Sequence, residues 1–88
     1  MEIRYSVQYN LNGHIENYNF ESRFYNTTVP IQVGEILSVS HIRGHIVDLK
    51  VTKISRDLYC NETETLKQAS DDLLHFNIEC EVVNVTRK

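Results

Sequence analysis

The N-terminal stretch Met1–Phe24, MEIRYSVQYNLNGHIENYNFESRF, predicts a β-hairpin, and this hairpin decides the fold expected for the chain. Over positions 1–11 the odd residues are apolar and the even residues are polar, a pattern typical of a strand with one solvated face. Asn12-Gly13 follows and favours a type I′ turn, because both residues accept a positive φ. We therefore expect strands over about 2–11 and 14–24.

The register of this hairpin follows from the turn. If Asn12-Gly13 is the whole loop, residues whose numbers sum to 25 face each other, so Tyr5 faces Phe20 on the apolar side. The polar side then forms two opposite-charge pairs, Glu2 with Arg23 and Arg4 with Glu21. A shift by one residue would destroy both sets of pairs, so together they predict this register.

A second hairpin is predicted in the middle of the chain. Odd positions are apolar over 37–39 and again over 47–51. Pairing residues whose numbers sum to 88 aligns the two runs and leaves Arg43-Gly44-His45 as the loop.

The C-terminal third predicts one helix, near 62–75, and a last strand. Asn61 and Glu64 have the spacing of a capping box. Leu66, Ala69, Leu73 and Phe76 then form one apolar stripe at helical spacing. Alternation resumes from Ile78, and its parity changes at Val82-Val83, which indicates either a bulge or a strand covered on both faces.

These elements predict a single domain over residues 1–88 of the α+β class, mainly β. The expected architecture is a curved five-stranded antiparallel sheet or small barrel in the order β-β-β-β-α-β. Two strands alone are marginal in water, so each element needs the others to bury its apolar face.

Two segments, Val29–Leu37 (VPIQVGEIL) and Ile46–Ile54 (IVDLKVTKI), resemble a recurring pattern of small SH3-like barrels. In those barrels a proline–glycine–acid step begins a strand, and the next strand ends in a short apolar run. Similar modules occur in phage and mobile-element proteins. The resemblance covers about residues 29–58 and implies a fold but no site residue.

Composition and charge narrow the class of protein. No run approaches the roughly 18 apolar residues of a membrane span, and the N-terminus has no basic region followed by an apolar stretch. We therefore expect a cytoplasmic protein without a membrane partner. The cysteines, Cys60 and Cys80, match no metal or redox spacing and are interpreted as thiols in preference to a disulfide.

No catalytic constellation is visible, so the sequence predicts a protein that is not an enzyme and uses no cofactor. There is no glycine-rich phosphate loop and no identifiable nucleophile–base pair. His41 and His45 have a spacing that grips metals on helices, but they flank a predicted hairpin loop, and no carboxylate or thiol groups with them. We interpret them as ordinary loop histidines and predict no metal site.

The main functional hypothesis, that the chain binds another protein, is based on its tyrosines, because tyrosine supplies a large and fairly rigid contact area. Most aromatic residues of the first hairpin are interpreted as core, whereas Tyr9, Tyr18 and Tyr25 are candidates for contact with a partner. The expected function is that of a small protein-binding module, an inhibitor or accessory protein of a phage or mobile element. Exposed strand edges also favour a homodimer formed through a sheet edge.

Two alternatives remain open. The net charge is −3, yet residues 41–56 carry four basic residues against one acidic residue. This island predicts nucleic-acid binding as the main alternative, through Arg43, Lys50, Lys53 and Arg56. A small barrel that binds a small molecule in a cavity is the third reading.

Overall fold

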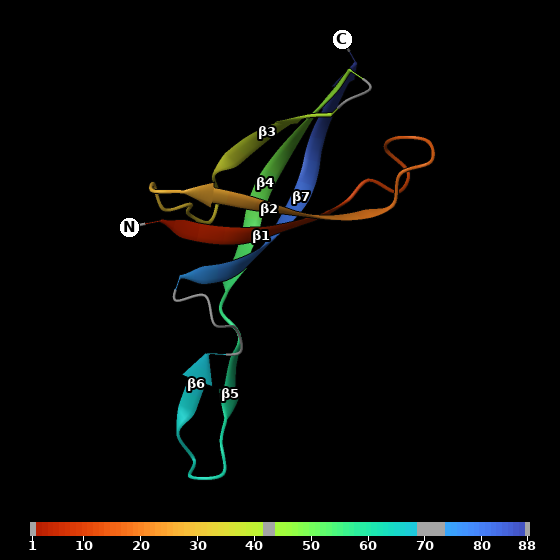
Figure 1. Ribbon diagram of the computed structural model, residues 1–88. Helices are drawn as coiled ribbons and strands as arrows, with labels where there is room; N and C mark the ends of the chain where they lie inside the picture. The colour runs from red at the N-terminus through yellow and green to blue at the C-terminus, as the bar shows by residue number, and fades with distance from the viewer. Residues whose placement is uncertain (1, 42–43, 69–73, 88) are drawn as a thin grey trace.

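The computed structural model describes residues 2–41, 44–68 and 74–87 of the chain. These residues form seven strands and no helix: β1 (Ile3–Asn10), β2 (Phe20–Thr27), β3 (Ile36–Ser40), β4 (His45–Ser55), β5 (Leu58–Cys60), β6 (Leu66–Gln68) and β7 (His75–Arg87). Five strands make one sheet in the order β2-β1-β7-β4-β3, and β5 pairs with β6 in a separate hairpin (Figure 1). The prediction of a mainly β fold with a curved five-stranded sheet is confirmed. The predicted antiparallel pairing is wrong for one pair of neighbours, because β1 and β7 run parallel.

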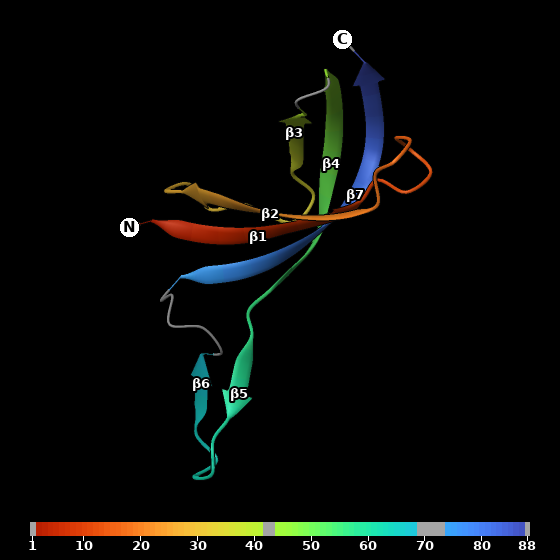
Figure 2. The ribbon, with the colours of Figure 1, turned by 45° about the vertical axis from the view of Figure 1, so that its right-hand side comes forward.

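The sheet curls into a half-barrel because its two longest strands carry bulges. β4 and β7 pair antiparallel, and the register shifts leave Val83 of β7 and Thr52 of β4 without an opposite residue. An extra residue in one strand bends the pair and increases its twist. Figure 2 shows β1 and β2 crossing the direction of β3 and the upper part of β4. The parity change at Val82-Val83 is therefore a bulge.

The register predicted for the first hairpin is wrong. β1 and β2 pair antiparallel with residue numbers that sum to 30, so Tyr5 faces Tyr25 and Arg4 faces Asn26. The observed sum of 30 differs from the predicted sum of 25 by an odd number. The residues of β2 that were expected on the core face therefore lie on the opposite face of the hairpin. Phe20 therefore lies away from the core and is 61% exposed. The predicted charge pairs, Glu2 with Arg23 and Arg4 with Glu21, are not in register.

The reason for the error is the loop, which spans residues 11–19 instead of two residues. Leu11 and Ile15 are buried, so the loop contributes to the core rather than extending the strands. The amides of His14 and Ile15 both donate to the carbonyl of Leu11, which gives a tight turn around Gly13 with its φ of +85°. Burial of two large aliphatic side chains outweighs the local preference for a two-residue turn.

The second hairpin, β3–β4, exists as predicted but with a register sum of 86 instead of 88. Because the difference is even, the same residues face the core. Ser38 now lies opposite Asp48, and its hydroxyl donates to the carboxylate at 2.6 Å. Gly44 has a φ of +84° and directly precedes β4, the position where such loops favour a left-handed residue. Of the predicted loop, Arg43 lies outside the described residues.

The helix predicted near 62–75 is wrong for the described part of that range. Its first residues form the turn and second strand of the β5–β6 hairpin, and His75 begins β7. The Asn61 side-chain oxygen accepts hydrogen bonds from the amides of Thr63 and Thr65, at 3.0 and 2.9 Å. Asn61 therefore closes a turn instead of capping a helix, and a helix of that length is marginal alone. Residues 69–73 lie outside the description.

The core fills the concave side of the curled sheet. Its buried side chains are Tyr5, Val7, Tyr9, Leu11, Ile15, Ile31, Val47, Leu49, Val51 and Ile78. The buried Tyr5 hydroxyl accepts a hydrogen bond from the Ile31 amide at 2.9 Å, which fixes the connection between β2 and β3 to the core. The β5–β6 hairpin projects away from this body (Figures 1 and 2), and the principal extents are 52 × 26 × 22 Å.

Both cysteines are free: Cys60 is exposed on β5 and Cys80 is partly buried on β7. Within the described ranges no helix is long and apolar enough to cross a membrane.

Replacing Leu49 by alanine is expected to lower the free energy of unfolding by about 2–5 kcal/mol, because the side chain is fully buried and its removal leaves a cavity. Leu58→Ala is the matched control, since Leu58 is half exposed on the projecting hairpin and should cost less than about 1 kcal/mol. Urea denaturation measures both. Equal losses would contradict the placement of the core.

The two thiols are expected to differ in reactivity at pH 8. Burial raises the pKa of the Cys80 thiol to about 11, so only about one molecule in a thousand carries the reactive thiolate at this pH. A Cys60→Ser variant, which retains only Cys80, should react with a disulfide reagent at least about tenfold more slowly than a Cys80→Ser variant, and faster as the pH rises. Comparable rates in the two folded variants would be inconsistent with the burial of Cys80.

Candidate functional site

A groove lies between β2 and β3, the two edge strands of the curled sheet. Its larger part has a volume of about 440 Å³ and a smaller part about 300 Å³. Both parts are lined by Tyr9, Arg23 and Val39, so we treat them as one feature, the edge groove. The remaining lining residues are Val7, Tyr18, Phe24, Tyr25, Ile36, Leu37, Ser38, Ser40 and His41.

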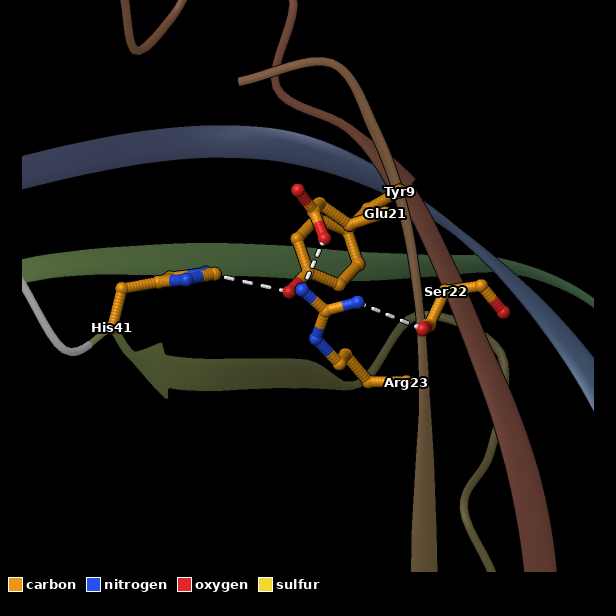
Figure 3. Close-up of polar contacts among 5 residues, drawn as sticks. All are labelled: Tyr9, Glu21, Ser22, Arg23 and His41. Atoms are coloured by element: carbon orange, nitrogen blue, oxygen red, sulfur yellow. Dashed lines mark hydrogen bonds and ion pairs between the residues drawn. The ribbon is translucent and has the colours of Figure 1, made fainter. Parts of the chain in front are cut away.

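The floor of the edge groove is built on Tyr9. Tyr9 lies on the core face of β1 and is 2% exposed, but its hydroxyl reaches Nε2 of His41 at 3.3 Å (Figure 3). Either group can be the donor, because the tyrosine hydroxyl and the imidazole nitrogen each donate or accept according to the tautomer of the histidine. Tyr18 contacts the same imidazole edge-on, with ring centroids 5.7 Å apart. One end of the groove is therefore a cluster of two tyrosines and a histidine.

A charged pair stands beside this cluster. Arg23 forms an ion pair with Glu21 at 2.5 Å, and it also donates to the backbone carbonyl of Ser22 at 3.0 Å (Figure 3). Glu21 and Arg23 are two residues apart on β2, so they lie on the same face of the strand as Tyr9. Two bonds thus hold the guanidinium at the mouth of the groove, where most of the side chain remains in solvent.

The Tyr9 hydroxyl has a raised pKa. Burial is the largest cause; the nearby Arg23 guanidinium lowers the pKa, and Glu21 raises it again. At neutral pH this group is therefore an uncharged hydroxyl. The Tyr9 hydroxyl is thus a polar group at the base of the edge groove, among mainly apolar lining atoms.

All three tyrosines predicted to contact a partner line the edge groove. Tyr9 belongs to both parts, Tyr18 lies at the histidine end, and Tyr25 lies at the other end and is half exposed. Sequence reasoning missed Arg23 and His41 as groove residues. No signal marks Arg23, because its place depends on the β1–β2 register; the only signal for His41 is its position beside a hairpin loop.

Three of the four predicted basic residues lie in the described part of the chain, and two of these three lie beside acidic residues. Lys50 lies opposite Glu81 across the β4–β7 pair, and the Lys53 ammonium is 3.8 Å from Glu79. The Arg56 guanidinium lies 5.6 Å from the centre of the Phe76 ring. Arg43 lies outside the described residues.

The two histidines of the β3–β4 hairpin have structural contacts. The His41 amide donates to the His45 carbonyl at 2.8 Å and closes the hairpin. Nowhere in the described parts of the chain do three or more His, Cys, Asp or Glu side chains group closely enough to hold a metal ion.

Comparisons with protein-family models, curated proteins and solved structures find no match for this chain. The resemblance to SH3-like barrels therefore stays a prediction.

A Tyr9→Phe variant tests the hydrogen bond between the Tyr9 hydroxyl and His41. At pH 7 the loss of the bond to His41 is expected to cost about 0.5–1.5 kcal/mol of unfolding free energy. The folded-state pKa of Tyr9 lies above its ordinary value of 10.0, so its contribution to stability is complete below pH 10 and is lost as the pH rises through the folded-state value. Between pH 9 and 11 the variant should therefore lose less stability than the wild type. Denaturation at several pH values measures this, and equal slopes would contradict it.

Proposed function

We propose that this chain is a non-enzymatic protein-binding module that receives an extended segment of a partner protein in the edge groove. The observation that carries the proposal is that β2 and β3, the two edges of the sheet, border the same apolar groove. Each edge strand pairs with one neighbour only in the described sheet, so its outer backbone groups are available to another strand.

Strand addition suits the chemistry of this surface. Backbone hydrogen bonds to an edge give affinity, and pockets for alternate side chains give specificity. Val7, Leu37 and Val39 offer apolar contact to inward side chains, while the Tyr9 hydroxyl and the Arg23 guanidinium offer polar contact. An added strand beside β2 or β3 would narrow the opening of the half-barrel.

The narrower proposal, an inhibitor or accessory protein of a phage or mobile element, rests on the sequence resemblance and on the small size of the domain. Nucleic-acid binding is less well supported, because Lys50 and Lys53 lie beside acidic residues. It is retained as an outcome of the binding experiment.

The test uses one groove variant and one matched control. Ile36 lines the groove, and Val83 is a similarly exposed aliphatic residue on β7 outside it. Immobilised wild type and Val83→Lys are expected to retain the same protein from a host lysate, and Ile36→Lys to lose it. The purified partner should then bind at least about tenfold more weakly to Ile36→Lys, since the change places a charge in an apolar contact.

Three results would count against the proposal. They are retention of no protein by the wild type, equal retention by both lysine variants, and capture only of oligonucleotides with an affinity that falls steeply with salt, which would favour the nucleic-acid alternative. Circular dichroism confirms that each variant is folded before its binding is compared.

A further inference from the structure

Edge strand β2 carries a sequence that is symmetric in its chemistry. Phe20-Glu21-Ser22-Arg23-Phe24 reads aromatic, acid, serine, base, aromatic, so Ser22 is the centre of a short palindrome with opposite charges on its two sides. The whole segment lies within β2, whose only partner in the described sheet is β1.

The two faces of this segment differ. Phe20 and Phe24 lie on the outer face and are 61% and 64% exposed, although the Arg4 guanidinium stacks 4.1 Å from the centre of the Phe24 ring. Glu21 and Arg23 lie on the opposite face, and Arg23 and Phe24 both border the edge groove. A pair of large exposed aromatics on a strand with an open edge indicates an interaction surface.

We propose that β2 pairs antiparallel with β2 of a second copy of this chain about a twofold axis at Ser22. This inference goes beyond the proposed function, because it names a second copy of the chain as the occupant of the β2 edge. Residues whose numbers sum to 44 then face each other, so Phe20 faces Phe24 of the second copy, and Glu21 faces Arg23 of the second copy. By symmetry each of these pairs forms twice.

The pairing is self-complementary on both faces. The outer face gains two cross-strand aromatic pairs, and the inner face gains two opposite-charge pairs. Because each copy already holds a Glu21–Arg23 ion pair, the four charges form a square of alternating sign. A twofold interface requires this kind of surface, which complements itself.

Neighbouring registers lack the complementarity. A sum of 46 places Arg23 opposite Arg23 of the second copy, and a sum of 42 places Glu21 opposite Glu21 of the second copy; like charges directly opposite are destabilising. An odd sum such as 43 places Phe20 opposite Arg23 of the second copy, which joins the outer face of one sheet to the core face of the other. The charge order of β2 therefore selects one register and favours a second copy over an unrelated strand.

Charge reversal tests the proposal by sedimentation velocity. The wild type is expected to be a dimer, and Glu21→Arg and Arg23→Glu alone should each dimerise at least about tenfold more weakly, because each creates two like-charge pairs. An equimolar mixture of the two variants should regain dimers, since arginines on one copy then face glutamates on the other. The double variant Glu21→Arg/Arg23→Glu should also dimerise, and Glu62→Arg, in the β5–β6 turn, is the control that should stay dimeric.

The register is tested separately by cross-linking in a Cys60→Ser background. Ser22→Cys should form a covalent dimer on mild oxidation, because the two thiols meet at the axis. Asn26→Cys, on the same strand and face, should not, because its two copies would lie eight residues apart along the paired strands. Equal cross-linking of both would overturn the register.

The outcomes separate this inference from the proposed function. A wild type that stays monomeric to roughly 100 µM, or a mixture of charge variants that fails to dimerise, overturns the second copy as occupant. If such a monomer still retains a partner through Ile36, the binding module stands. If the dimer forms as described but no other protein is retained, the dimer stands and the binding module falls.

Discussion

The pairing of β7 with two neighbours is the constraint on which the rest of the structure depends. Residues 75–79 of β7 pair parallel with β1, and residues 77–87 pair antiparallel with β4. The Arg4 amide donates to the Leu74 carbonyl at 2.8 Å, where the parallel pairing begins. Because a single strand joins the two hairpins, a bend in β7 or β4 rotates one hairpin against the other. The bulges at Val83 and Thr52 supply that bend.

The edge groove is a consequence of the same bend. A flat sheet in this strand order would hold β2 and β3 at opposite margins, separated by three strands. Because the sheet curls, β2 and β3 both border the edge groove, which lies over Tyr9 and next to His41. Binding residues from distant parts of the chain therefore meet without any catalytic arrangement among them.

The sequence predicts the class of this fold better than its details. Alternation over 1–11 and 47–51 identifies β1 and β4, and the parity change at Val83 locates a bulge, because a period of two is a strong signal over these runs. The β1–β2 register is wrong because Leu11 and Ile15 are read as strand residues, although the core needs them in a loop. The predicted helix is wrong over its described residues, because the capping box and the apolar stripe express a local preference that the pairing of β5 with β6 overrides.

The sequence likewise predicts some residues of the candidate site but not how they come together. Residue type marks Tyr9, Tyr18 and Tyr25 as contact residues, but their common position depends on the curl of the sheet and on the true register of β2. Arg23 is out of reach of sequence reasoning because the predicted register pairs it with Glu2. Only the observed strand pairing places it beside Tyr9.

The parallel contact of β1 with β7 has a consequence for biosynthesis. Its residue pairs run from Arg4–His75 to Gln8–Glu79, so the inner edge of β1 is covered only after all the residues between the two strands have been made. During translation the β1–β2 hairpin therefore has two unpaired edges until β7 is made. Unpaired strand edges and exposed apolar side chains make such an intermediate prone to pair with a neighbouring nascent copy until β7 docks.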